Sequence, residues 1–295
     1  MRSVHNSSFR LHPYKRPMKK LFLCLLFLTA CTQTPAPTRT LPPIQVTVVT
    51  LTAPAAMTTP MLPNPSGTMS PATPLSPTTL TITAPDGAPL AASFYPPVPI
   101  AQGAGHASRA PGVLLLPMYG ASRTDWVAFA LHLQERGTAA LALDLRGFGE
   151  SPGPENWSQA LLDVRAAWET LIARPEVDAQ HSAIIGASVG ANLALMIGAN
   201  NPNVVTVVAL SPGLNYLQLQ PALVMSTFGA RPVLLIASQD DAYSYTSAQQ
   251  LALLAPLAET YFFKQAGHGM VMFNDPVLEP LLLDWLQKYV GLMKG

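Results

Sequence analysis

The chain has 295 residues, of which 49% are hydrophobic and only 11% charged, and it contains 30 prolines and 19 glycines. This length and apolar content suit one large domain, and they exclude a collagen-like or a globally disordered chain. The first 30 residues hold six Lys or Arg and no acidic residue, and the remainder holds 11 basic against 16 acidic residues. A mildly acidic body gives no electrostatic footprint for nucleic acid, so we expect no nucleic-acid partner.

Residues 1–30 have the order of a secretory signal peptide. Basic residues precede the apolar run Leu21–Leu28, and small residues follow it. That run is about half as long as a bilayer-spanning helix needs, so it fits a signal better than a membrane span. Met18 is the more natural start of such a signal, and we expect residues 1–17 to be an upstream extension.

The four residues Leu28–Cys31, with the sequence Leu-Thr-Ala-Cys, resemble the lipobox of bacterial lipoproteins. The resemblance implies cleavage before Cys31, acyl chains on that residue, and an exported protein anchored by lipid to a membrane of the bacterial cell envelope. Each buried methylene of such chains contributes about 0.8 kcal/mol of membrane affinity. Thr32 stands where an inner-membrane retention signal has Asp, which favours the outer membrane of a two-membrane bacterium. The alternative is an ordinary signal peptide in which Cys31 is incidental.

Residues 31–78 are expected to form a disordered tether. In residues 32–78, 11 are Pro and 12 are Thr, none is acidic or aromatic, and Arg39 carries the only charge. Such a segment buries too little apolar surface to offset the loss of chain entropy, and its prolines keep it extended. The interpretation is a spacer that lifts a folded domain, residues 79–295, away from a membrane. Ile44–Leu51 is the stretch of the tether with strand-like composition.

From residue 79 onward, short apolar runs alternate with helical patterns. We expect strands at Thr79–Thr83, Leu90–Tyr95, Val113–Pro117, Ala139–Asp144, Ser182–Gly186, Val204–Leu210, Val233–Ala237 and Thr260–Phe263. We expect helices at Trp126–Arg136, Trp157–Ile172, Ala191–Ala199, Ser247–Leu257 and Leu278–Val290. The alternation predicts an α/β fold with a mostly parallel central sheet covered by helices on both faces, and an N-terminal antiparallel hairpin at one edge. Both cysteines precede this body, which excludes a disulfide or a Cys-based zinc site within it.

A Gly-x-Ser-x-Gly motif lies at Gly186–Gly190, directly after an expected strand and before an expected helix. The glycines allow a tight strand-to-helix turn that exposes the hydroxyl of Ser188 above the sheet. The helix that begins there also aims its N-terminal N–H groups at the same place. The alternative is a glycine-flanked packing turn without chemistry.

A serine hydroxyl is a weak nucleophile unless a base removes its proton. Of the six histidines, His268 is the candidate, because it follows the last expected strand between two glycines. Asp240 and Asp241 follow the strand that ends at Ala237, so either is placed to orient the imidazole. Three other aspartates lie in or beside expected helices and are expected to be surface charges: Asp163, Asp178 and Asp284.

The segment Leu143–Ser151 (LDLRGFGES) resembles the D-x-R-G-x-G-x-S turn of α/β-hydrolases such as esterases, monoglyceride lipases and serine aminopeptidase-like members. The resemblance covers the chain from about Thr79 to Gly295. It implies the α/β-hydrolase fold and a catalytic set of Ser188, Asp241 and His268. The family acid usually stands three residues after a small residue that ends its strand, here Ser238, which favours Asp241 over Asp240.

The resemblance also implies an oxyanion hole made by two backbone N–H groups. One belongs to the residue after the nucleophile, here Val189, and the other to the loop after the third strand, which often begins His-Gly. This chain departs from that pattern, with Pro117 and Met118 in place of His-Gly. Counting back from the helix that starts at Trp126 places Tyr119 at the second donor position, with Met118 as the alternative, and Pro117 has no N–H to donate. The ring of Tyr119 is a further candidate to line the cleft.

Only Ser211–Arg231 separates the two strands between which the family often inserts a lid, so a large helical cap does not fit. Four apolar residues there are candidate cleft walls: Leu214, Tyr216, Leu217 and Phe228. No metal or nucleotide cofactor is implied, because Gly147-Phe148-Gly149 lacks the third glycine and the opening helix of a dinucleotide loop.

The sequence therefore predicts a serine hydrolase of the carboxylic ester hydrolase class, acting on small ester or related acyl substrates through an acyl-enzyme. Two alternatives remain open. One is a serine peptidase or a dienelactone or lactone hydrolase on the same scaffold. The other is a non-catalytic envelope lipoprotein that keeps the fold, because a fold alone does not name an activity.

Overall fold

The computed structural model describes residues 75–99 and 109–292, all within one compact unit of the chain. The expected signal peptide, Cys31 and all but the last residues of the expected tether lie outside the described residues. The strands are β1 (Thr78–Thr83), β2 (Pro89–Tyr95), β3 (Ala110–Leu116), β4 (Ala139–Leu143), β5 (Val177–Ala187), β6 (Thr206–Leu210), β7 (Val233–Ser238) and β8 (Ala258–Phe263). The helices are α1 (Val127–Glu135), α2 (Ala160–Ile172), α3 (Val189–Asn200), α4 (Ala242–Ala252) and α5 (Leu278–Val290).

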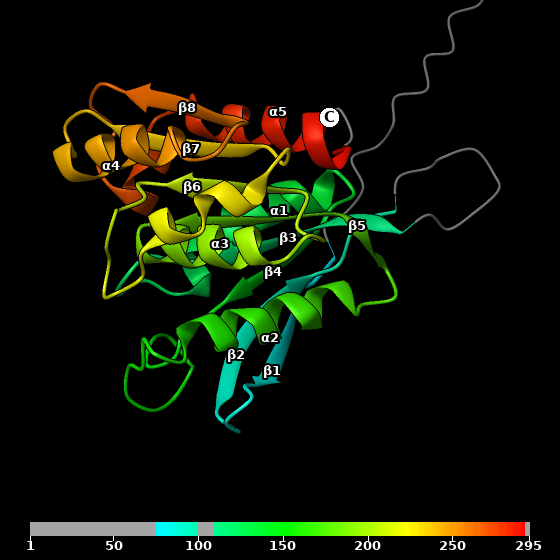
Figure 1. Cartoon of the computed structure of the whole chain (residues 1–295). Coiled ribbons are helices and arrows are strands. Elements are labelled where there is room, and N and C mark those ends of the chain that lie inside the picture. The colour runs from blue at the N-terminus through cyan, green and yellow to red at the C-terminus, as the bar shows by residue number, and fades with distance from the viewer. Residues whose placement is uncertain (1–74, 100–108, 293–295) are drawn as a thin grey trace, which may run out of the picture. The chain divides into compact units, whose positions relative to one another are not determined.

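The strands form one sheet in the order β1-β2-β4-β3-β5-β6-β7-β8, with β1 and β2 at one edge and β8 at the other (Figure 1). The β1–β2 and β2–β4 pairs are antiparallel, and every pair from β4 to β8 is parallel. Strands β4, β6 and β7 are buried at every position, which explains why their sequences are almost entirely apolar. The expected mostly parallel sheet with an antiparallel N-terminal hairpin is confirmed.

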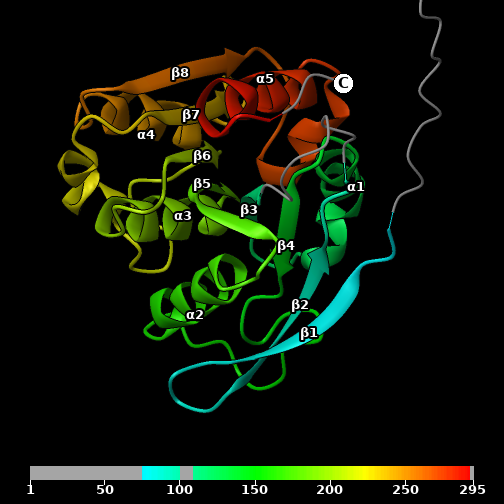
Figure 2. The ribbon, with the colours of Figure 1, turned by 90° about the vertical axis from the view of Figure 1, so that its right-hand side faces the viewer.

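Helices cover both faces of the sheet and create two hydrophobic cores. Helices α2, α3 and α4 pack on one face around residues such as Trp168 and Leu193. Helices α1 and α5 pack on the other face around residues such as Phe129 and Leu282. Figure 2 shows the two layers on either side of the sheet. In the part of the chain that the structure describes, no helix has the length and apolar character needed to cross a membrane.

Two elements, α4 and β5, begin five residues earlier than the sequence predicts. The helix expected at Ser247–Leu257 is α4, which starts at Ala242 because the carboxylate of Asp241 caps it by accepting the N–H of Ser244 at 3.3 Å. Its first turn is polar, so hydrophobic periodicity misses it. Strand β5 begins at Val177, where a short polar stretch pairs with the start of β3 before a register shift.

The buried carboxylate of Asp144 organises the turn after β4. It accepts the backbone N–H of Arg123 at 2.6 Å and that of Glu150 at 2.8 Å, and it pairs with the Arg123 guanidinium. The hydroxyl of Ser151 donates to the carbonyl of Asp144 at 2.8 Å and accepts the N–H of Ala91 at 2.9 Å. Asp and Ser of the D-x-R-G-x-G-x-S turn therefore tie β2, β4 and the segment after β3 together.

The Arg of this turn, Arg146, forms ion pairs with two carboxylates. It donates to both oxygens of Asp163 at 2.9 and 2.6 Å, and to both oxygens of Asp86 at 2.7 and 3.0 Å. The expectation that Asp163 is a surface charge is therefore wrong, because its side chain is only 3% exposed and faces Arg146 from α2. Helical spacing alone does not reveal a partner that comes from a distant turn. Asp284 is exposed, as expected.

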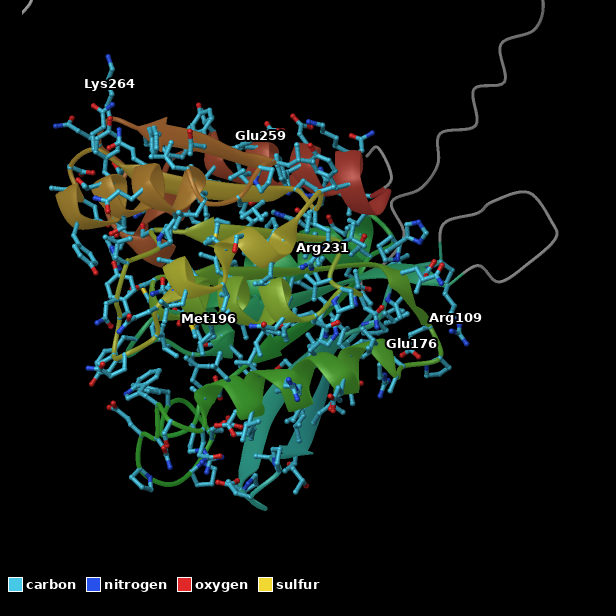
Figure 3. All side chains as sticks on the ribbon, viewed as in Figure 1. Arg109, Glu176, Met196, Arg231, Glu259 and Lys264 are labelled. Atoms are coloured by element: carbon cyan, nitrogen blue, oxygen red, sulfur yellow. The ribbon has the colours of Figure 1, made fainter. Side chains whose placement is uncertain are left out.

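The carboxyl end of α3 is held by Arg231, from the segment before β7. Its guanidinium donates to the carbonyls of Gly198, Asn201 and Val204 at 2.6, 2.9 and 3.0 Å. A cation at a helix C-terminus satisfies free carbonyls and opposes the negative end of the helix dipole. In Figure 3, Arg231 is labelled near the middle of the view, to the lower right of Lys264, which follows β8. Because α3 directly follows β5, the amino end of α3 lies on the side of the sheet where the parallel strands end.

We predict that Asp144→Asn lowers the free energy of unfolding by about 3 kcal/mol, because removing one partner of a buried ion pair leaves the other charge uncompensated. Urea denaturation followed by circular dichroism measures the change. Asp284→Asn, at an exposed carboxylate, is the matched control and should leave the midpoint nearly unchanged. Equal effects of the two substitutions would show that Asp144 does not organise the turn.

Candidate active site

Ser188 sits at the sharp turn between β5 and α3. Its backbone has φ 54° and ψ −117°, a conformation that costs a residue with a side chain about 1–3 kcal/mol. The turn is held by hydrogen bonds: the N–H of Ser188 donates to the carbonyl of Leu210 at 2.8 Å, and its own carbonyl accepts the N–H of Ala191 at 2.9 Å. The expected strand–turn–helix setting of the Gly-x-Ser-x-Gly motif is thus present.

The two motif glycines are needed because the backbone approaches itself closely here. A Cβ on Gly186 would lie 2.1 Å from the carbonyl oxygen of Gly190. A Cβ on Gly190 would lie 2.4 Å from the carbonyl oxygen of Pro117, the residue that follows β3. Both distances are far below van der Waals contact, so any side chain would push the turn apart. The second contact also brings the loop after β3 next to Ser188.

The structure brings His268 and Asp241 to Ser188. The Nε2 atom of His268 lies 2.7 Å from Ser188 Oγ, and Nδ1 lies 2.6 Å from Asp241 Oδ2. A carboxylate beside Nδ1 favours the tautomer with its proton on that nitrogen, which leaves Nε2 able to accept the serine proton. The three side chains therefore form a continuous hydrogen-bonded relay, with the serine only 7% exposed.

The neighbouring carboxylate, Asp240, occupies a different place. Its Oδ1 accepts the N–H of Gly267 at 3.3 Å, and the hydroxyl of Ser238 holds the pKa of this carboxyl below its usual range. It makes no hydrogen bond with His268. Asp240 therefore braces the glycine-flanked turn that carries the imidazole, while Asp241 faces the ring.

The turn that carries His268 is anchored on both sides. The N–H of Gly269 donates to the buried hydroxyl of Ser211, the residue that follows β6, at 2.9 Å. The short 3₁₀-helix Gly269–Asn274 then places Phe273 against Trp126 and Phe129, each with ring centroids 5.6 Å apart. Because both anchors are packed or buried, the imidazole is held in place before any substrate binds.

One expected oxyanion donor, Val189, directly follows Ser188, and the loop that carries the other begins where Pro117 lies against Gly190. Val189 is the first residue of α3, so its N–H has no acceptor within the helix. Met118 and Tyr119 begin a turn that is closed by a hydrogen bond from Ala121 N–H to the carbonyl of Met118 at 3.2 Å. The Tyr119 ring packs against Phe148 and its hydroxyl donates to Glu155 at 3.0 Å, so the ring belongs to an aromatic cluster on the outer side of this loop.

Sequence reasoning overlooked one polar residue near the imidazole, named a second only as a wall of the cleft, and misplaced one apolar residue. Tyr216 is predicted only as a wall, but its ring stands edge-on to His268, with centroids 6.3 Å apart. Ser244 lies beside the same imidazole, with Oγ 3.4 Å from Nδ1. Its position three residues after Asp241, in the first turn of a capped helix, is the sequence signal that marks it. Phe228 is 2% exposed and belongs to the core under α3, so it does not line the cleft.

Several solved structures share this architecture. The alpha/beta hydrolase GrgF from Penicillium sp. sh18 aligns with 74% of this chain and 100% of its own at 15% identity and a TM-score of 0.63. An esterase of Pyrococcus furiosus aligns with 73% of this chain and 92% of its own at 17% identity, TM-score 0.59. An acetyl xylan esterase from Paenibacillus sp. R4 aligns with 72% and 83% at 17% identity, TM-score 0.61. The chain has the α/β-hydrolase fold.

Sequence comparison adds a likeness within this α/β-hydrolase scaffold. Residues 112–248 match the family model described as serine aminopeptidase, S33. This stretch contains Ser188 and Asp241 and ends before His268. Two uncharacterized proteins of Mycobacterium tuberculosis, from strains CDC 1551 / Oshkosh and H37Rv, are each 32% identical over 92 residues, which is 31% of this chain. The chain matches only 33% of the length of these relatives.

We predict that Asp241→Asn and Asp240→Asn have very different effects on turnover. Asp241→Asn should lower kcat for p-nitrophenyl acetate by about 10⁴, because the amide favours the wrong imidazole tautomer. Asp240→Asn should lower it by less than about tenfold, because that carboxylate acts only on the backbone of the His268 turn. Steady-state kinetics on folded variants measures both, and the reverse ranking would contradict the relay seen here.

Proposed function

We propose that the protein is a serine hydrolase that cleaves carboxylic esters through an acyl-enzyme intermediate. The observation that carries the proposal is the relay from Asp241 through His268 to Ser188, with contacts of 2.6 and 2.7 Å. Nucleophile, base and orienting acid within hydrogen-bond reach are the parts that this chemistry needs. The sharp turn between β5 and α3 places Ser188 at the amino end of α3, where the helix dipole stabilises developing negative charge.

In the first half of the proposed reaction, Ser188 Oγ attacks the acyl carbon and its proton passes to Nε2 of His268. The tetrahedral intermediate then collapses, and the leaving alcohol takes that proton from Nε2. In the second half, water attacks the acyl-enzyme and gives a proton to Nε2, and the bond between the acyl carbon and Oγ breaks as Oγ takes the proton back. Asp241 keeps the ring oriented and stabilises the imidazolium in both halves.

The negative oxygen of each tetrahedral intermediate is proposed to lie between two backbone donors, the N–H groups of Val189 and Tyr119. Loss of one such donor typically costs about 10²–10³ in kcat. The contact of Gly190 with the end of β3 supports this arrangement, because it fixes the loop that carries Tyr119 against the first turn of α3.

The segment that lies over the site favours a small, soluble substrate, because it is too short to form a large helical lid. Ser211–Arg231 contains only two short 3₁₀-helices, Pro221–Leu223 and Met225–Phe228, and no long helix that would form a lid. Two of the similar solved structures are named esterases, which supports ester rather than amide cleavage. The family model named for a serine aminopeptidase supports one alternative, cleavage of an amide on the same scaffold.

We predict that Ser188→Ala removes turnover of small p-nitrophenyl esters by roughly 10⁴–10⁶ while the protein stays folded. The wild-type protein should hydrolyse p-nitrophenyl acetate faster than long-chain esters, lactones or aminoacyl p-nitroanilides. Circular dichroism is the control for folding. Faster cleavage of the aminoacyl p-nitroanilide than of the ester would indicate a peptidase. Full ester turnover by folded Ser188→Ala would show that Ser188 is not the nucleophile.

We further propose that the domain is carried as a lipoprotein of the bacterial envelope, anchored through Cys31 as the lipobox resemblance implies. The segment 31–78 would act as its spacer. The described domain begins to make contacts slightly before the end of that segment, since the carbonyl of Leu75 accepts the side-chain N–H of buried Gln134 at 3.0 Å. A soluble form for biochemistry should therefore keep Leu75.

We predict that the full chain, expressed in a bacterium, carries lipid on Cys31 and partitions into the detergent phase. The acyl chains should hold the protein in that phase, because burying them is more favourable than leaving them in water with the domain. Cys31→Ser should block lipid addition and leave precursor or a soluble product. Cys24→Ser is the matched control, because Cys24 lies inside the apolar run of the signal and should be dispensable. Mass spectrometry of the mature N-terminus measures the outcome, and an unmodified Cys31 in mature protein would refute the anchor.

A further inference from the structure

The loop of residues 117–122, called the oxyanion loop below, carries one of the two proposed oxyanion donors and is fixed at both ends. At its start, the carbonyl oxygen of Pro117 lies against Gly190 too closely for any side chain to fit between them. Just after its end, the N–H of Arg123 donates to the buried carboxylate of Asp144 at 2.6 Å. Tyr119 lies between these two anchors, so neither of them alone sets the direction of its N–H.

The middle of the oxyanion loop has a third attachment, which runs through the side chain of Tyr119. The phenol hydroxyl donates to Glu155 Oε1 at 3.0 Å, and Glu155 belongs to the segment between β4 and α2, drawn in green in Figure 1. The other oxygen of the same carboxylate accepts the indole N–H of Trp157 at 3.1 Å. One carboxylate therefore joins the residue that carries the proposed donor to a neighbouring segment of the domain.

Three aromatic rings pack together beside this carboxylate. The ring of Tyr119 meets Phe148 edge-on, with centroids 5.2 Å apart, and stacks on Trp157 at 6.1 Å with an interplanar angle of 29°. The rings of Phe148 and Trp157 lie 6.0 Å apart. Aromatic pairs with such geometry add stabilisation beyond the area that they bury. The Tyr119 ring is therefore held by two rings and one hydrogen bond, although it is 52% exposed.

The backbone of Glu155 is in turn held by the turn that follows β4. A Cβ on Gly147 would lie 2.8 Å from the backbone nitrogen of Glu155, so these two parts of the segment are in direct contact. Gly147 has φ 83°, which favours glycine, and its N–H donates to the carbonyl of Ser151 at 3.2 Å. The hydroxyl of Ser151 is bonded to the carbonyl of Asp144. Glu155 thus rests on the same turn that Asp144 organises.

Resting on the acyl-enzyme mechanism above, we propose that Glu155 is a positioning residue that sets the direction of the Tyr119 backbone N–H through the Tyr119 side chain. Glu155 acts on Tyr119 and not on the reacting atoms. Its carboxylate fixes the phenol, and the phenol fixes the middle of the oxyanion loop before substrate binds. A donor that is already in place costs no reorganisation during the reaction. A hydrogen bond to an ionised acceptor suits this task, because it is about twice as strong as one between neutral groups.

The proposal has a kinetic signature, because an oxyanion donor acts in both halves of the reaction. Each half passes through a tetrahedral intermediate with negative charge on the same oxygen. Loss of positioning should therefore slow acylation and deacylation by similar factors, and KM should change little. A ring that only bound the leaving alcohol would slow acylation alone, because the alcohol has departed before deacylation begins. The two rate losses therefore distinguish positioning from binding of the leaving group.

The test is stopped-flow hydrolysis of p-nitrophenyl acetate by the wild-type protein, Tyr119→Phe, Glu155→Ala and the double variant. Tyr119→Phe keeps the ring and the backbone N–H and removes only the hydroxyl. Each single change should slow both acylation and deacylation by about tenfold, which is the lower end for a hydrogen bond to a charged group, because this pair is exposed. The double variant should be no more than about threefold slower than either single variant, because both changes break the same connection.

Tyr289→Phe is the matched control. The hydroxyl of Tyr289, on α5, donates to Glu259, on β8, at 3.1 Å, which is a second exposed hydrogen bond between a tyrosine and a glutamate. This pair lies outside the oxyanion loop and the segment that holds it. Tyr289→Phe should therefore leave the rates of acylation and deacylation within about threefold of the wild-type values. Circular dichroism checks that all variants are folded.

Four results would each overturn the proposal: wild-type rates in Tyr119→Phe, a loss confined to acylation, losses that multiply in the double variant, or an equal loss in Tyr289→Phe. Ser188→Ala in the same assay keeps the two claims apart. If folded Ser188→Ala keeps its activity, the proposed function fails. If Ser188→Ala is inactive while Glu155→Ala reacts at the wild-type rates, only the positioning role is rejected.

Discussion

The close contact between the first turn of α3 and the end of β3 is the constraint on which the site depends. Gly190 lies against the carbonyl oxygen of Pro117 so closely that no side chain fits between them. This contact forces a sharp turn after β5, and the turn places Ser188 in a backbone conformation that side-chain-bearing residues avoid. The sheet and the buried helix hold the strained turn in place, and the hydroxyl of Ser188 lies 2.7 Å from Nε2 of His268.

Parallel strands carry the other groups to the same place, because their carboxyl ends share one edge of the sheet. β3 is followed by the loop of Met118 and Tyr119, β6 by Ser211, β7 by Asp241, and the turn after β8 carries His268. Each of these segments is tied to its neighbour by a buried hydroxyl, a capped helix or an aromatic contact. The relay is therefore assembled before substrate binds, which lowers the cost of organising it during reaction.

The sequence predicts those residues of the site that a local sequence pattern marks. Ser188 is identified by a motif between a strand and a helix, and His268 by its place after the last strand. The choice between Asp240 and Asp241 does not follow from composition, because adjacent residues share every local signal. The resemblance to a family favours Asp241, and the structure puts that carboxylate at Nδ1.

Features that depend on distant partners are not visible in the sequence. Asp163 is buried only because Arg146 reaches it from another turn, and the place of Tyr216 is set by Asn192 and Tyr243. The start of α4 is also missed, since a cap and a polar first turn leave no hydrophobic period to detect. These residues lie in loops and caps, where hydrogen bonds between segments, rather than periodicity, decide the structure.

The most direct test of the account is to find which residue reacts with a fluorophosphonate. Such a reagent transfers its phosphonyl group to an activated serine oxygen with loss of fluoride, without depending on the natural substrate. Intact-mass measurement and peptide mapping of the folded domain should find one adduct, on Ser188, that is absent from Ser188→Ala and forms slowly in Asp241→Asn. An adduct on another serine, or none in folded wild-type protein, would contradict the claim that this strained turn presents an activated nucleophile.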